Sequence, residues 1–393
     1  MNKRLTFFFL LLLISIYPQT SSANEQPIES TNEPDRLINA PTIESNAGIL
    51  MDSYTGTVLF EKNADALYYP ASLTKIATAI FVLEHANLED VVTVSKNARR
   101  ADGTRVYLEE GEQMSLFQLT QGLLINSGND AGIAIAEHIS GSEEQFGKEL
   151  TTFLKETIHT TSTNFTNATG LFDEHHQTTA RDLALITQYA MNNDLFMEMF
   201  GTVYLPWVGQ SWNTTIITHH RMLKGEYEYE GTTGGKTGYV PESGFTLATT
   251  AERNQLHLIA IVLDGTNKSI YRDTRKLFNY GFDHYEPYRI AANSHFSYLE
   301  LDYTNEEEII YVKEKDSSVH SKVSPTGLLH LLNENGQLLK SVKLTNITPL
   351  PKTQIISLNT IELPLSHKEV PTNSVLILIG ATILGILLIR KLN

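Results

Sequence analysis

The chain has 393 residues, 41% of them hydrophobic, and carries a formal net charge of −15. A chain of this length buries a large core and has room for more than one domain. The acidic balance disfavours nucleic acid as a partner. The absence of cysteine excludes disulfides, thiolate catalysis and cysteine-ligated metal or iron–sulfur sites.

The chain begins with the pattern of a secretory signal peptide, predicted over residues 1–23. Two basic residues precede an apolar run from Phe7 to Ile16, and small residues lead up to a cleavage site after Ala23. A permanent N-terminal anchor fits less well, because the apolar run is shorter than the ~20 residues of a membrane span. The polar, proline-bearing residues 24–42 predict a flexible leader.

A catalytic domain is predicted over residues 43–287, with strands at both ends and helices between them. Strands are predicted at 47–52, 56–61, 244–249 and 256–262, and helices at 71–84, 116–124, 130–136, 181–191 and 269–280. Pro70 suits the start of the first helix, and Ser115 can cap the second. This order predicts an α+β fold, an antiparallel sheet flanked by helices, and not a βαβ repeat.

The composition changes from about residue 288. Short β-rich runs alternate with polar turns and predict a small all-β C-terminal domain over 288–366. An apolar segment follows, and with its flanks it predicts a C-terminal transmembrane helix over 374–390, although the run is slightly shorter than the usual ~20 residues. Arg390 after the span favours a cytoplasmic C-terminus, which would leave the rest outside the cell. A buried core helix is less expected at an extreme terminus.

Three short motifs carry the chemistry of the chain. Ser72-Leu73-Thr74-Lys75 places a hydroxyl and an amine on one face of a helix. Ser127-Gly128-Asn129 falls on a predicted turn between two helices, and Lys236-Thr237-Gly238 lies on a predicted strand edge. A Ser-x-x-Lys pair alone arises by chance about once or twice in a chain of this size. All three motifs in this order predict an active site.

The first motif suits nucleophilic catalysis. A serine hydroxyl needs a base to remove its proton, and Lys75 can serve only if burial or nearby positive charge lowers its pKa. We expect Lys236 to supply that charge. The backbone N–H groups of Ser72 and Tyr239 are predicted to form an oxyanion hole, and Gly238 would let a substrate backbone lie against the strand edge.

Two other interpretations of the sequence are weaker. The glycine-rich stretch before Lys236 lacks the spacing of a phosphate-binding loop and precedes a strand, not a helix. The histidine pairs at 175–176 and 219–220 lack the spacing of metal ligands on one helix face. We therefore predict no metal and no cofactor, and expect His176 to support the wall of the site by hydrogen bonding.

The motifs, with Asn167 to Asp182, resemble the signatures of the serine D-alanyl-D-alanine carboxypeptidases, the low-molecular-mass penicillin-binding proteins of the SxxK acyltransferase family. The resemblance covers about residues 40–285. It implies a β-lactamase/transpeptidase-like fold and a peptidase at the bacterial cell membrane with its catalytic domain extracytoplasmic. Its substrate would be a peptidoglycan stem peptide ending in D-Ala-D-Ala, and β-lactams would inhibit it.

The resemblance implies three catalytic residues. Ser72 would attack the carbonyl between the two terminal D-alanines, and Lys75 would be its general base. Ser127 would relay a proton toward the leaving D-alanine, after which water would hydrolyse the acyl-enzyme. β-Lactams would acylate Ser72 in the same way.

The resemblance also implies a substrate-binding set. Asn129 would position the acyl side, and Lys236 and Thr237 would hold the terminal carboxylate. Gly238 and Tyr239 would lie beside the peptide backbone along the strand edge.

Two departures from the family pattern concern carboxylate recognition. Val240 stands where the family usually has threonine. Ile270 stands at the usual arginine position, with Arg272 two residues later as a displaced substitute. These departures leave open a catalytically weak penicillin-binding-like wall protein, and a β-lactamase is the alternative within the enzymes. Gly128, where the Ser-Asp-Asn pattern has aspartate, argues against the β-lactamase.

Overall fold

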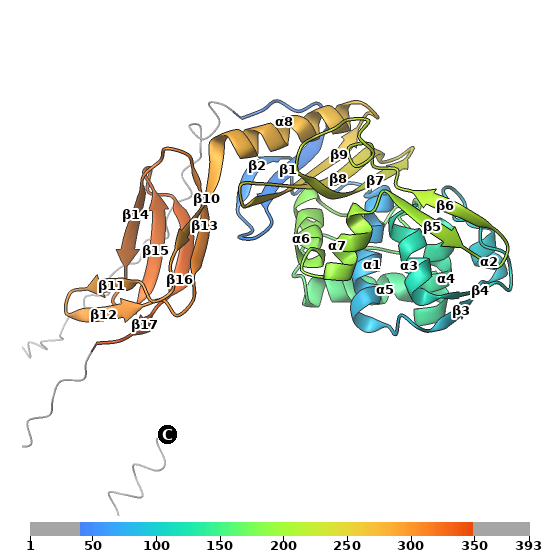
Figure 1. Ribbon diagram of the computed structural model, residues 1–393, viewed down its shortest axis with the longest axis horizontal. Coiled ribbons are helices and arrows are strands. Elements are labelled where there is room, and N and C mark those ends of the chain that lie inside the picture. The colour runs from blue at the N-terminus through green and yellow to red at the C-terminus, as the bar shows by residue number, and fades with distance from the viewer. Residues whose placement is uncertain (1–39, 349–393) are drawn as a thin grey trace, which may run out of the picture. The chain divides into compact units, whose positions relative to one another are not determined.

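The computed structural model describes residues 40–348 (Figure 1). The chain divides into two compact units, Met1–Asn346 and Ile347–Asn393, and only two residues of the second unit are described. The predicted signal peptide over 1–23, nearly all of the predicted leader and the predicted anchor over 374–390 lie outside the described residues. The domain boundaries at 43–287 and 288–366 remain predictions.

The fold prediction needs one correction, which concerns the transmembrane helix that it included. Within residues 40–348, none of the helices combines the length and the apolar character that crossing a bilayer requires. Among the helices found there, Ser269–His284 buries one face and exposes the other, whereas Thr74–His85 is buried on all sides from Thr74 to Val82.

A five-stranded antiparallel sheet forms the centre of the catalytic part, in the order β2-β1-β9-β8-β7. The strands are β1 (Ala47–Asp52), β2 (Val58–Lys62), β7 (Thr232–Val240), β8 (Gly244–Arg253) and β9 (Leu256–Gly265). Side chains of a strand alternate between its faces. In β9, Ile259 and Ile261 therefore enter one core, and Leu258, Ala260 and Val262 enter another.

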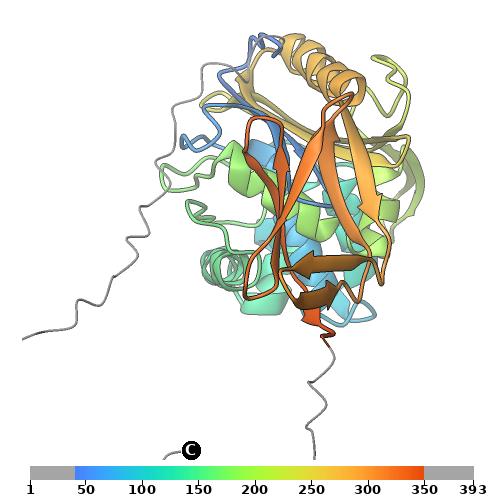
Figure 2. The same cartoon turned by 90° about the vertical axis from the view of Figure 1, so that its left-hand side faces the viewer.

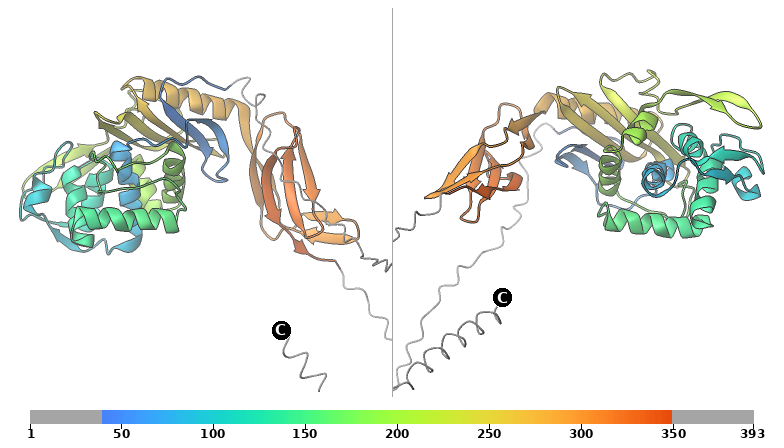
Figure 3. Two further views of the ribbon diagram at one scale, coloured as in Figure 1. Left: turned by 180° about the vertical axis from the view of Figure 1, so that it is seen from behind. Right: turned by 60° about the horizontal axis from the view of Figure 1, so that its bottom comes forward.

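Helices cover both faces of this sheet, which explains why β9 is apolar on both faces. The long helix α8 (Ser269–His284) lies on one face and the remaining helices lie on the other (Figures 1 and 3). These are α1 (Thr74–His85), α2 (Lys96–Arg99), α3 (Leu116–Leu124), α4 (Asn129–Ser140), α5 (Glu143–Glu156), α6 (Ala180–Ala190) and α7 (Asp194–Gly201). Ser115 caps α3 as predicted, because its hydroxyl accepts a hydrogen bond from the N–H of Gln118.

Two short pairs of antiparallel strands were not predicted from the sequence. One pairs β3 (Val91–Thr93) with β4 (Gln113–Ser115), and the other pairs β5 (Tyr204–Val208) with β6 (Asn213–Ile217). Strands of three to five residues carry too little alternation to stand out in a sequence.

The C-terminal part of the described chain is built of strands, as predicted. They are β10 (Tyr285–Ile290), β11 (His295–Tyr298), β12 (Leu301–Thr304), β13 (Ile309–Glu314), β14 (Val319–Val323), β15 (Leu328–Asn333), β16 (Leu338–Lys343) and β17 (Thr345–Asn346), and Figure 2 shows them facing the viewer. They enclose a core of their own, which includes Tyr303, Tyr311 and Leu331.

Candidate active site

Ser72 lies on a single 3₁₀ turn, Ala71–Leu73, directly before α1. The turn is held from two sides. The hydroxyl of Thr246 on β8 donates to the carbonyl of Pro70 at 3.0 Å. On the other side Gly170, with φ +81°, packs so closely that a Cβ there would collide with the carbonyl of Ala71. These contacts fix the position of the Ser72 hydroxyl at the start of the helix.

Lys75 is fully buried, and its amine meets the Ser72 hydroxyl. Its Nζ lies 2.8 Å from Ser72 Oγ and 2.7 Å from Asn129 Oδ1, and it also bonds the carbonyl of Thr169. Burial lowers the pKa of Lys75 well below its usual value of 10.5, and the charge of Lys236 lowers it further. A neutral amine could donate its two hydrogens to Asn129 and Thr169 and accept the Ser72 proton on its lone pair.

The structure ranks the two causes that were expected to lower the pKa of Lys75. Lys236 was expected to supply the positive charge and does so, but burial is the larger cause of the lowered pKa and the Lys236 charge comes second. The buried carboxylate of Asp130 acts in the opposite direction. The free amine is favoured chiefly because water is excluded from around it.

Ser127 lies on the turn between α3 and α4 with φ +62°, a left-handed conformation that is uncommon for serine. Its hydroxyl accepts a hydrogen bond of 2.9 Å from the amine of Lys236, which also donates to the carbonyl of Thr237 at 2.9 Å. Burial lowers the pKa of Lys236 to about 7. Ser127 thus stands beside a second lysine that titrates near neutrality.

Asn129 uses its side chain within the protein. Its Oδ1 accepts from Lys75, and its Nδ2 donates to the carbonyl of Asp102 at 2.6 Å. Its backbone N–H donates to the carbonyl of Thr104 at 2.7 Å. The residue therefore connects the Lys75 amine to the loop at 102–104.

The third motif lies on β7, which closes one edge of the central sheet. Lys236 and Thr237 pair with Ala248 and Leu247 of β8, so their backbones are fixed by the sheet. At Gly238 a Cβ would lie 2.8 Å from the backbone nitrogen of Ser72. This close approach brings the strand at Gly238 and Tyr239 against the Ser72 N–H and requires a glycine there.

These residues border one open cleft of about 650 Å³. Its lining includes Ser72, Gly103, Thr104, Arg105, Tyr107, Asn126, Ser127, Asn129, Thr169, Gly170, Leu171, His219, Thr237, Gly238, Tyr239, Val240 and Pro241. Lys75 and Lys236 are buried against it. The structure therefore brings together the predicted residues of all three motifs.

The two further predicted residues lie elsewhere. His176 is buried; its Nδ1 accepts from the N–H of Thr166 at 3.0 Å, so its Nε2 is left to donate to Thr74 Oγ1 at 2.8 Å. Burial lowers the pKa of His176 to about 3, so it stays neutral as a support behind the Ser72 helix. Arg272 does not line the cleft and instead forms an exposed ion pair of 2.9 Å with Glu44.

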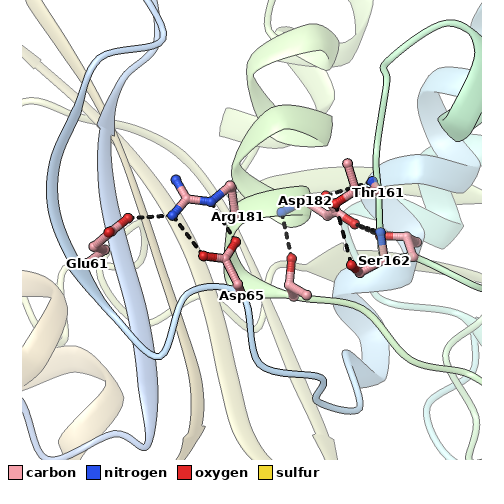
Figure 4. A network of polar contacts seen from close by, with 8 residues as sticks. Glu61, Asp65, Thr161, Ser162, Arg181 and Asp182 are labelled. Carbon is pink, nitrogen blue, oxygen red and sulfur yellow. Dashed lines mark hydrogen bonds and ion pairs between the residues drawn. The ribbon is translucent and has the colours of Figure 1, made fainter. Parts of the chain in front are cut away.

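A polar network ties the start of α6 to the rest of the domain (Figure 4). Arg181 reaches Glu61 and Asp65, and Asp182 accepts from the backbone N–H groups of Thr161 and Ser162. The segment held by Asp182 leads on to the Thr169–Gly170 wall of the cleft. The network therefore fixes the approach to that wall.

Asp130 is a structural residue that the sequence analysis did not single out. It is fully buried, and its carboxylate accepts from the N–H groups of Val106 and Leu108, both at 3.0 Å. Burial raises the pKa of Asp130, and these backbone hydrogen bonds oppose the rise. Its position directly after Ser127-Gly128-Asn129 could have drawn attention to it. An acidic residue in the first turn of a helix is common, however, and does not by itself indicate a buried structural role.

The comparisons with known proteins agree with this geometry. Residues 35–267 match the family model described as D-alanyl-D-alanine carboxypeptidase. The chain is 32% identical over 251 residues to D-alanyl-D-alanine carboxypeptidase DacF of Bacillus subtilis, covering 62% of this chain and 63% of that protein. It is 31% identical over 292 residues to D-alanyl-D-alanine carboxypeptidase DacC of Escherichia coli, covering 69% and 67%.

A solved structure shows the same fold. Penicillin binding protein 5 from Haemophilus influenzae aligns with a TM-score of 0.69 at 23% identity, covering 79% of this chain and 98% of that one. This likeness supports the predicted transpeptidase-like α+β fold with an all-β C-terminal part. Since the family model matches more than half of the residues, the chain belongs to the D-alanyl-D-alanine carboxypeptidase family.

Proposed function

We propose that the protein is a serine peptidase that removes the terminal D-alanine from peptidoglycan stem peptides ending in D-Ala-D-Ala. The observation that carries the proposal is the distance of 2.8 Å between the buried Lys75 amine and Ser72 Oγ in an open cleft. Membership of the carboxypeptidase family supports the substrate class. Because this substrate belongs to the cell wall, we also propose that the catalytic part is extracytoplasmic.

Acylation begins when Ser72 Oγ attacks the carbonyl carbon between the two D-alanines and its proton passes to Lys75 Nζ. The carbonyl oxygen becomes an oxyanion facing the backbone N–H groups of Ser72 and Tyr239. The carbon–nitrogen bond then breaks as Ser127 passes a proton to the leaving amine. The position of Ser127 beside Lys236 supports this relay.

The substrate terminus lies toward Lys236 and Thr237, where its carboxylate favours the protonated form of the Lys236 amine and accepts from the Thr237 hydroxyl. The substrate backbone lies along the free edge of β7, beside Gly238 and Tyr239, as an added strand. Asn129 positions the acyl side from the opposite wall. The ester on Ser72 is then hydrolysed by water, which releases the shortened peptide.

β-Lactams would acylate the same hydroxyl, because their reactive amide occupies the position of the scissile bond. The experiment therefore measures two readouts on the purified protein. One is D-alanine release from a D-Ala-D-Ala peptide, and the other is covalent labelling by a fluorescent penicillin. We expect the wild-type protein to show both and Ser72→Ala to show neither.

A matched control is Ser53→Ala, at a serine that follows β1 and does not line the cleft. It should retain both D-alanine release and labelling. Retained penicillin labelling in Ser72→Ala would refute the assignment of the nucleophile. Rapid turnover of the penicillin without D-alanine release would favour a β-lactamase instead.

A further inference from the structure

Arg105 stands out among the described residues of the cleft because its guanidinium meets an aromatic ring and no carboxylate. It lines the cleft and is half-buried, with its guanidinium 5.2 Å from the ring centroid of Tyr107. Within residues 40–348, Arg105 forms no ion pair, whereas Arg99, Arg181 and Arg289 each meet a carboxylate. A half-buried arginine left unpaired on a concave surface is available to a ligand.

The backbone around Arg105 is fixed on both sides. Val106 and Leu108 donate to Asp130, and the carbonyl of Arg105 itself accepts from Asn126 Nδ2 at 3.0 Å. The carbonyl of Val106 accepts from Trp212 Nε1 at 3.1 Å. A loop held by four hydrogen bonds presents its arginine in a set direction, which lowers the entropic cost of binding.

The charge of the cleft differs from that of the whole chain. The chain carries a formal charge of −15, yet none of the described residues that line the cleft is an aspartate or a glutamate. Arg105 is the one arginine or lysine among those lining residues, and Lys75 and Lys236 are buried beneath them. Such a surface attracts an anionic ligand within an otherwise acidic protein.

The proposed function accounts for one anionic group only, the terminal carboxylate near Lys236 and Thr237. That carboxylate ends the substrate, and the two D-alanines carry methyl side chains. A second anionic group can therefore belong only to the residues that precede D-Ala-D-Ala. Arginine suits such a group because its planar fork binds a carboxylate through two parallel hydrogen bonds.

We propose that Arg105 is a specificity-determining residue that binds a free carboxylate on the side chain preceding D-Ala-D-Ala. The inference rests on the proposed function and names the substrate class within it. The preferred stem peptides are those whose third residue ends in a carboxylate, over those in which that carboxylate is amidated.

The test compares two synthetic peptides, N-acetyl-L-2-aminopimelyl-D-Ala-D-Ala with its side-chain carboxylate either free or amidated. The full-length protein should cleave the free acid with a kcat/KM about tenfold higher or more, the size expected for a charge-assisted hydrogen bond. In Arg105→Gln the ratio of the two kcat/KM values should fall toward one. Arg105→Lys should keep part of the ratio, because it retains charge without the fork.

Arg100→Gln is the matched control, since Arg100 is exposed at the end of α2 and does not line the cleft. It should keep the wild-type ratio, and thermal unfolding of all variants checks that they fold. Equal cleavage of both peptides by the wild-type protein would overturn the role of Arg105 and leave the proposed function intact. Failure to cleave either peptide or to label with penicillin would instead overturn the proposed function.

Discussion

The floor of the cleft and its rim differ in how their charged groups are satisfied. On the floor, Lys75 and Lys236 are buried and their amines are hydrogen-bonded to Ser72, Ser127 and other fixed acceptors. On the rim, Arg105 is held by its backbone while its side chain meets only an aromatic ring. We therefore propose that the floor carries out the reaction, whereas the rim selects the substrate.

The largest expected effect is at the base. Lys75→Ala removes the proton acceptor of Ser72, and general-base catalysis contributes about 10²–10⁴ in rate. We expect kcat/KM for D-alanine release and the rate of penicillin acylation to fall together by about that factor. A fall of less than tenfold in both rates would show that another group accepts the proton.

A smaller effect is expected at Asp130, which connects the Ser127 turn to the loop that carries Arg105. Asp130→Asn keeps the shape of the side chain, but its NH₂ group would face a backbone N–H of the loop. Leaving one buried N–H unsatisfied costs about 1–3 kcal/mol in the free energy of unfolding. Chemical denaturation should show this loss, and the KM for the peptide should rise because the loop carrying Arg105 is less well fixed. An unchanged KM would show that Asp130 does not influence how the loop presents Arg105.

A pH-dependent effect is expected from the buried lysines. Lys236 has a folded-state pKa of about 7 and an unfolded value near 10.5, so folding releases a proton between these pH values. Its contribution to the free energy of unfolding should therefore rise with pH in that window, by up to about 1.4 kcal/mol per pH unit. Denaturation between about pH 7.5 and 9.5 should show a shallower rise in Lys236→Met. An identical slope would mean that Lys236 stays protonated on folding.

The smallest effect is expected far from the cleft. Arg181→Ala removes the ion pairs with Glu61 and Asp65 at the surface end of the α6 network (Figure 4). Such partly exposed pairs contribute about 1 kcal/mol or less each. The midpoint temperature of thermal unfolding should fall slightly, and kcat/KM should remain at the wild-type value. A large loss of activity would show that this network controls the Thr169–Gly170 wall.

The sequence predicted the floor better than the rim. Ser72, Lys75, Ser127 and Lys236 belong to short motifs whose spacing reflects a helix turn, a tight turn and a strand edge, so their convergence could be anticipated. Arg105 and Asp130 do not belong to a motif whose spacing reveals their role. Their importance depends on contacts between a loop and a helix about 25 residues later, which only the folded chain displays.

The same reason explains why the order of causes at Lys75 and the position of Arg272 could not be predicted from the sequence. A sequence shows which charges are present but not which atoms exclude water, so burial could not be ranked above the Lys236 charge. Arg272 was placed by its offset along a helix, yet its partner is Glu44, near the opposite end of the described chain. Long-range pairing of this kind leaves no trace in local pattern.

We infer that burial keeps the Lys75 amine free to take the Ser72 proton. The most direct test is the pH dependence of the second-order rate of penicillin acylation in the wild-type protein and in Lys236→Met. If burial dominates, the acidic limb of both profiles should lie well below pH 10.5, with only a modest upward shift in the variant. If the acidic limb instead moves to the pKa of an ordinary lysine in Lys236→Met, the Lys236 charge and not burial keeps the Lys75 amine free.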